Sequence, residues 1–149
     1  MTAPPTHAVR VSQTMRATPD RLFQAWTDPK ELANWWRLEG DGWAFAGATL
    51  NLTVGGRYRL AMTSPDGKSH VAVGEYRQID RPRRLVFTWD WEDVGSRVGE
   101  TIVTIEFRPA GAGQTEVVLT HERFPNGKAA HGHEWGWTQL LRLLEQATS

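Results

Sequence analysis

The chain has 149 residues, a length that fits one domain with room for a hydrophobic core. Its 17 Lys and Arg side chains balance 17 Asp and Glu side chains, and no long basic run is present, which argues against nucleic acid as a partner. The lack of cysteine excludes disulfides, thiolate nucleophiles and zinc–cysteine sites. No apolar run approaches the roughly 20 residues that span a bilayer, and the first residues lack the charged-then-apolar order expected of a signal peptide. The sequence therefore predicts a cytoplasmic protein without membrane insertion.

The first part of the chain predicts a tail, a strand and two short helices. Residues 1–7 read as a disordered tail because of their paired prolines, and residues 8–149 read as a single domain. Apolar and polar residues alternate from Val9 to Met15, as in a half-buried strand. Thr18-Pro19 and Asp28-Pro29 each combine a helix N-cap with a proline at the first helical position.

The middle of the chain predicts a series of strands separated by turn signals. The predicted strands cover residues 42–53, 57–63, 69–79, 84–91, 100–108 and 115–123. Gly55-Gly56 and Pro65-Asp66-Gly67 mark tight turns between them. Consecutive strands with short connections indicate an antiparallel meander.

Residues 129–147 predict one long helix. Trp137, Leu140, Leu141 and Leu144 recur at i, i+3, i+4 and i+7, which places them on one apolar stripe. A single long helix after a run of strands predicts an α+β fold in which the sheet wraps around that helix. We expect Trp137 to be buried against the sheet and Gly136 to let the helix approach it closely.

Several motifs in order resemble one known family. They are Trp26-Thr27-Asp28-Pro29-Lys30-Glu31-Leu32 with Trp35-Trp36, Gly55-Gly56-Arg57-Tyr58, Pro65-Asp66-Gly67, Arg84-Leu85-Val86-Phe87-Thr88-Trp89, Thr120-His121 and Gly136-Trp137. Together they resemble the bacterial relatives of the activator of the ninety-kilodalton heat-shock chaperone ATPase, in the START-like or SRPBCC superfamily, which includes the birch-pollen-allergen fold. The resemblance covers residues 9–147.

This resemblance implies a helix-grip fold, with about seven antiparallel strands curved around the C-terminal helix and two short helices after the first strand. It also implies a deep apolar cavity. It does not fix an activity, because the superfamily includes lipid carriers, polyketide cyclases and co-chaperones on one scaffold.

Strand parity and the helix stripe predict the residues that bind a small apolar or aromatic ligand between the sheet and the last helix. The predicted ligand-binding residues are Tyr58, Met62, Phe87, Trp89, His121, Trp137 and Leu141, with Trp35 and Trp36 near the entrance. The alternative is that these rings simply fill the core, which leaves no cavity.

His121 is the candidate polar residue of this site, because it lies on the same strand face as Val117 and Leu119. It is either a hydrogen-bonded core histidine, or a polar anchor or general acid/base for a ligand. The second reading predicts a cyclase- or hydrolase-type enzyme that uses His121 with Tyr58 or Glu75. A third reading, a co-chaperone-like interaction module, rests on family analogy alone.

No metal or cofactor is expected. His131 and His133 are two residues apart, so they point in different directions on a helix, and the His-Glu-x-x-His metalloprotease pattern is not completed. The expected partner is a small hydrophobic molecule. The sequence leaves a homodimer open, and a chaperone partner follows from analogy only.

Overall fold

A computed structural model describes residues 7–149, which form one curved sheet and three α-helices. The strands are β1 (His7–Met15), β2 (Ala44–Leu50), β3 (Arg57–Thr63), β4 (Ser69–Asp80), β5 (Arg84–Trp91), β6 (Thr101–Pro109) and β7 (Thr115–Phe124). The helices are α1 (Pro19–Thr27), α2 (Pro29–Leu32) and α3 (Gly127–Thr148), and a short 3-10 helix η1 (Val94–Ser96) lies between β5 and β6.

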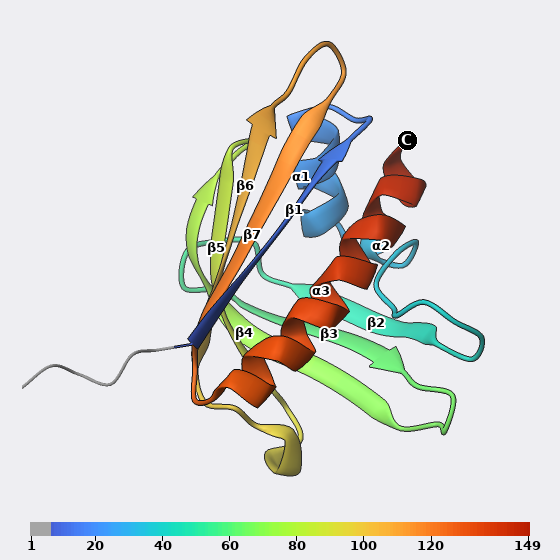
Figure 1. Cartoon of the computed structure of the whole chain (residues 1–149), viewed down its shortest axis with the longest axis vertical. Helices are drawn as coiled ribbons and strands as arrows, with labels where there is room; N and C mark the ends of the chain where they lie inside the picture. The colour runs from blue at the N-terminus through green and yellow to red at the C-terminus, as the bar shows by residue number, and fades with distance from the viewer. Residues whose placement is uncertain (1–6) are drawn as a thin grey trace, which may run out of the picture.

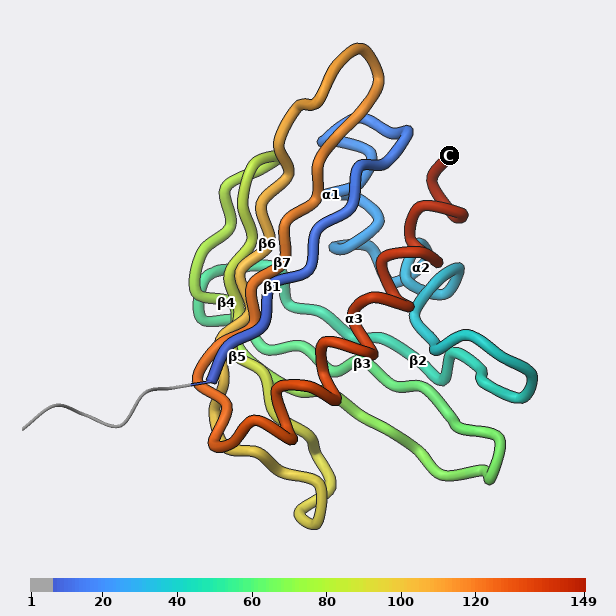
Figure 2. Tube along the Cα trace, viewed as in Figure 1, coloured from blue at the N-terminus to red at the C-terminus, as the bar shows by residue number. Residues whose placement is uncertain are grey.

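The seven strands form one antiparallel sheet in the order β1-β7-β6-β5-β4-β3-β2. Figure 1 shows α3 running across the open face of this sheet, and the trace in Figure 2 shows β2 to β4 turning away from β1, β6 and β7. α3 packs against β1, β7 and α1. The predicted fold class, a sheet curved around the C-terminal helix, is confirmed.

Several predicted boundaries shift by a few residues for local reasons. α3 begins at Gly127, two residues before the predicted start, because the Asn126 side chain accepts a hydrogen bond from the N–H of Ala129 at 2.8 Å. α2 ends at Leu32, so Trp35 lies in the turn that follows the helix and Trp36 comes directly after that turn. Most of the predicted tail lies outside the described residues, and His7 already belongs to β1.

A close approach between β4 and β5 helps to bend the sheet. A Cβ atom on Gly74 would lie 1.9 Å from the carbonyl oxygen of Thr88, so only glycine fits there. The register of the two strands shifts between Tyr76 and Gln78, and such irregularities increase local twist.

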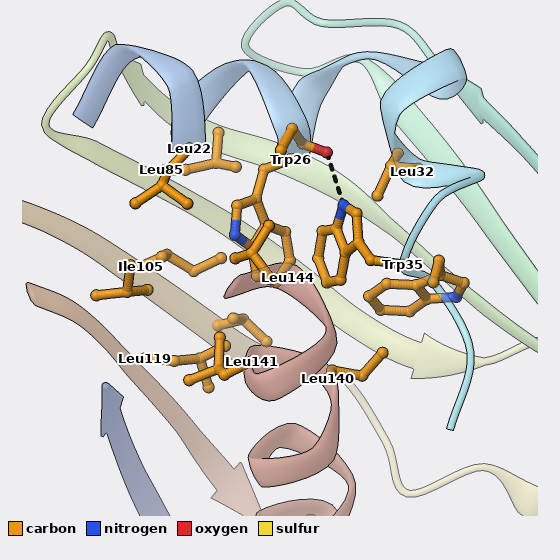
Figure 3. Packing of buried hydrophobic residues seen from close by; sticks show 14 of the residues in the cluster. Leu22, Trp26, Leu32, Trp35, Leu85, Ile105, Leu119, Leu140, Leu141 and Leu144 are labelled. Atoms are coloured by element: carbon orange, nitrogen blue, oxygen red, sulfur yellow. Dashed lines mark hydrogen bonds between the residues drawn. The ribbon is translucent and has the colours of Figure 1, made fainter. Parts of the chain in front are cut away.

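The core lies between the sheet, the two short helices and the second half of α3. Figure 3 shows Leu141 and Leu144 of α3 facing Leu119 and Ile105 of the sheet, with Trp26 and Trp35 closing the space from above. All six side chains are less than 4% exposed. The predicted apolar stripe on α3 is therefore confirmed, and it closes this part of the molecule. Within residues 7–149, no helix combines the length and apolar character needed to cross a membrane.

Candidate functional site

An open apolar groove separates the first half of α3 from β3, β4 and β5. Its volume is about 590 Å³. It is lined by Trp36, Leu38, Trp43, Met62, His70, Trp89, Trp91, Ser96, Val98, Asn126, Lys128, Ala129, Gly132, His133, Trp135, Gly136, Trp137 and Leu140. The loop that carries η1 lies beside the first turns of α3 and supplies one end of the groove (Figure 1). A volume of this size is in the range of small-molecule sites.

The helical side of the groove lacks side chains at two positions. Gly132 and Gly136 are four residues apart, so they lie on one face of α3, and both line the groove. A Cβ atom at either position would meet no atom within 4 Å apart from the neighbouring residues and backbone of its own helix, and neither glycine has a positive φ. The prediction that Gly136 allows close helix–sheet approach is wrong, because the space beside it is empty. These glycines instead leave the groove open.

Aromatic rings form most of the opposite wall and the inner end. Six of the eight tryptophans of the chain line the groove. The ring centroids of Trp89 and Trp137 are 5.0 Å apart, and Trp36 meets Trp89 edge-to-face at 6.0 Å. The buried indole N–H groups of Trp36 and Trp89 have no hydrogen-bond partner within residues 7–149. These rings are therefore positioned by ring–ring contacts.

His133 is held as a neutral residue in the wall of the groove. The Trp91 indole N–H donates to its Nε2 atom at 3.2 Å, so its Nδ1 atom carries the proton and donates to the Ala129 carbonyl at 2.8 Å. Burial lowers the pKa of His133 from its ordinary value, and the Ala129 hydrogen bond opposes that shift. Both ring nitrogens are engaged, so His133 is a wall group with no free ligand atom.

His121 is fully buried behind the groove and is part of a short chain of hydrogen bonds. The Trp137 indole N–H donates to His121 Nδ1 at 3.0 Å, so Nε2 carries the proton and donates to Thr101 Oγ1 at 2.7 Å. Thr101 in turn donates to the Trp89 carbonyl at 2.7 Å. Burial, followed by the neighbouring His133, lowers the pKa of His121 to about 2. This geometry describes a hydrogen-bonded core histidine.

The predicted ligand residues divide into two groups. Trp36, Met62, Trp89 and Trp137 line the groove. Trp35, Tyr58, Phe87, His121 and Leu141 do not line it and are packed in the core. Around Tyr58 and Phe87 the remaining space is only about 10 Å³, which is at the lower limit for one water molecule.

The entrance and the polar partners also differ from expectation. Trp35 and Trp36 are 0% and 1% exposed, so the tryptophan pair was wrongly expected to lie near an entrance. Trp35 donates its N–H to the Ala25 carbonyl at 3.1 Å (Figure 3). Within residues 7–149, no hydrogen bond links His121 to Tyr58 or Glu75, and the Tyr58 hydroxyl donates to the Thr88 carbonyl. The same described residues contain no cluster of three or more His, Asp or Glu side chains placed to hold a metal ion.

Sequence reasoning missed several groove residues. Trp91 lies on the same face of β5 as Trp89, so the alternation of residues along this strand could have identified it. Trp43 lies just before β2 and His70 lies near the start of β4, where local patterns do not show which groups meet; their ring centroids are 5.6 Å apart. Gly132 carries no side chain, so an apolar pattern cannot detect it.

Comparison with known proteins identifies similar chains. The family model described as "Activator of Hsp90 ATPase homolog 1-like protein" matches residues 16–149. Protein CV1439 from Chromobacterium violaceum has 25% sequence identity and a TM-score of 0.80, over 95% of this chain and 96% of that one. The AHSA1 protein SPO3351 from Silicibacter pomeroyi has 24% identity and a TM-score of 0.79, over 94% and 96% of the two chains.

A third similar structure is CalU16 from Micromonospora echinospora, with 22% identity and a TM-score of 0.74. The match covers 97% of this chain and 77% of CalU16. No curated protein matches the sequence. The two structures below 25% identity support the fold alone.

Proposed function

The chain belongs to the family of Activator of Hsp90 ATPase homolog 1-like proteins, and on that premise we propose that it binds a small apolar or aromatic molecule in the groove beside the first half of α3. The residues proposed to contact the ligand are Trp36, Met62, Trp89 and Trp137 from the predicted set, together with Trp43, Trp91, Gly132 and Gly136. The other predicted residues support this wall from the core.

The glycine pair on α3 carries the proposal. Glycine in a helix interior costs about 1 kcal/mol relative to alanine. Neither Gly132 nor Gly136 relieves a steric contact or adopts a backbone conformation that would repay this cost. The benefit that fits both positions is space: a flat helix surface against which a ring or chain can lie, opposite the tryptophans.

The chemistry of the walls favours an apolar ligand. Indole rings offer large contact areas with few conformations to lose, and the lining groups are mostly apolar. Burying a modest apolar body at about 25 cal/mol per Å² of its surface is compatible with a micromolar dissociation constant, which corresponds to about −8 kcal/mol.

The test is titration with N-phenyl-1-naphthylamine, a neutral apolar dye whose emission rises in apolar surroundings. We expect saturable binding at micromolar dye. Gly136→Leu, which places a side chain in the groove, should weaken binding by about tenfold or more, because the space it fills is the space that the dye occupies.

His131→Leu provides the matched control. It adds an apolar side chain to an exposed position of the same helix, outside the groove lining. It should leave dye affinity within about twofold of wild type, the range of a neutral surface change. Absence of saturable binding, or equal losses in both variants, would contradict the proposed function.

A further inference from the structure

The groove lining contains basic side chains and no acidic ones. Among its lining residues no Asp or Glu occurs, whereas His70, Lys128 and His133 are basic. Both nitrogens of His133 are already engaged. Lys128 is exposed near the first turn of α3, and His70 lies at the opposite end, beside Trp43. A groove of this kind favours an apolar molecule that also carries an acidic group.

One ring nitrogen of His70 has a hydrogen-bond partner within the protein. Its Nε2 atom lies 3.0 Å from the hydroxyl of Ser64, a buried side chain that is 9% exposed. The same hydroxyl lies in a short hydrogen bond with the Asp66 carboxylate and 3.3 Å from the Lys68 carbonyl. The Ser64 hydroxyl, followed by the Lys68 backbone N–H, lowers the pKa of the Asp66 carboxyl.

These contacts determine which ring nitrogen of His70 is free. The Asp66 carboxylate and the Lys68 carbonyl can only accept, so the single hydroxyl proton of Ser64 goes to one of them. The hydroxyl oxygen then accepts from His70, and Nε2 must carry a proton. Nδ1 has no hydrogen-bond partner within residues 7–149. The relay Asp66–Ser64–His70 therefore orients the ring and leaves Nδ1 for a molecule in the groove.

We propose that the ligand of this groove is an aromatic or other apolar acid whose acidic oxygen binds His70 Nδ1. This inference rests on the proposed function and names its ligand class. A phenolic hydroxyl donates to Nδ1 of the neutral ring, whereas a carboxylate accepts from Nδ1 after the ring takes a proton from solvent. In both cases one proton is shared between the acidic oxygen and Nδ1, and the apolar body lies among the tryptophans.

The experiment compares 2-naphthoate with methyl 2-naphthoate, each displacing N-phenyl-1-naphthylamine. The two probes share a ring system, but the ester lacks the acidic oxygen. His70→Phe keeps an aromatic ring against Trp43 and removes both nitrogens. We expect it to weaken naphthoate binding by about tenfold and ester binding by less than about twofold, since a hydrogen bond to a charged group is lost only with the acid. Thermal melts of the variant check that its fold is retained.

Three results would overturn this assignment. Equal losses for acid and ester would make His70 a wall group only. A selective loss of naphthoate in Lys128→Ala, but not in His70→Phe, would place the acid at the other end of the groove. If the dye binds but His70→Phe does not change naphthoate affinity, the proposed function stands and the inference of an acidic ligand at His70 is wrong. If the dye does not bind at all, the proposed function itself is wrong.

Ser64 is inferred to be a positioning residue, because it acts through His70. Ser64→Ala should lower the ratio of acid affinity to ester affinity by about threefold, as a modest hydrogen bond is lost. Ser64→Thr, which restores a hydroxyl, should recover that ratio. A purely structural role would shift both probes together and leave the ratio unchanged.

Discussion

The two halves of α3 face the same sheet but meet it in different ways. In the second half, Leu141 and Leu144 are fully buried and fill the space up to the sheet. In the first half, Gly132 and Gly136 present no side chain, and the space opposite them is a groove of about 590 Å³. Trp137 lies at the junction and is buried in the core while also lining the groove.

This contrast separates stability from binding along one helix. Apolar burial by the leucines holds the helix to the sheet, because each fully buried leucine contributes about 1.5–3 kcal/mol of transfer free energy. The first half contributes less packing and retains open volume. A helix anchored at one end can therefore keep an open groove at the other.

The largest expected effect is at the junction. Trp137→Ala should lower the free energy of unfolding by about 3–5 kcal/mol, because it removes a 2%-exposed ring and leaves His121 Nδ1 without its donor. Trp135→Ala removes an equally large ring that is 62% exposed, and it should cost less than about 0.5 kcal/mol. Urea melts of both variants measure the difference. Similar losses of unfolding free energy would contradict the distinction between a packed second half and an open first half of α3.

The next effect is a loss of stability in acid. His121 has a folded pKa of about 2 against an ordinary value of 6.5, so the unfolded chain takes up its proton first as the pH falls. The stability contributed by neutral His121 is present above about pH 6.5 and declines below it by about 1.4 kcal/mol per pH unit, or about 2 kcal/mol by pH 5.

His121→Gln tests the origin of this decline, because glutamine does not titrate. Melts of both proteins from pH 7 to 5 should show a shallower slope in the variant, which is less stable at pH 7. His133, whose pKa is also lowered, keeps part of the slope in both proteins. Parallel slopes would mean that His121 takes up its proton over the same pH range in the folded protein as in the unfolded chain.

The smallest effect has the opposite sign. Gly132→Ala and Gly136→Ala should each raise the free energy of unfolding by about 1 kcal/mol, since each added methyl group meets empty space in a helix. Gly74→Ala should instead destabilise the protein, because its methyl group would meet the Thr88 carbonyl at 1.9 Å. Destabilisation by the two helical changes would show that the first half of α3 is closed by packing after all.

The fold was predictable because its signals are local and repeat. Alternation places Val103, Ile105 and Phe107 on one side of β6, and all three are at most 1% exposed. The helix stripe through Trp137 and Leu144 is buried as predicted. The sequence patterns of capping and turns limit the boundary errors to a few residues.

The site was only partly predictable, because strand parity identifies a face and not a position along it. Tyr58 and Met62 share a face of β3, yet Tyr58 is packed in the closed core and Met62 lines the groove. The difference depends on where α3 meets the sheet, which no local pattern records. The His70–Ser64 contact likewise joins the two sides of the turn between β3 and β4, and spacing in the sequence does not show that these two side chains point toward each other.

The tryptophan cluster links the fluorescence of the closed core, beside the second half of α3, to that of the groove wall beside its first half. Trp26 lies 4.7 Å from Trp35 and 6.4 Å from Trp36 between ring centroids, and Trp36 lies 6.0 Å from both Trp89 and Trp137. At such separations the excited states of indoles couple, and excitation energy passes from ring to ring before it is emitted. Light absorbed by Trp26 or Trp35, deep in the closed core, can therefore be emitted or quenched at a ring in the groove wall. A molecule that touches one ring of that wall would change the fluorescence of the whole cluster.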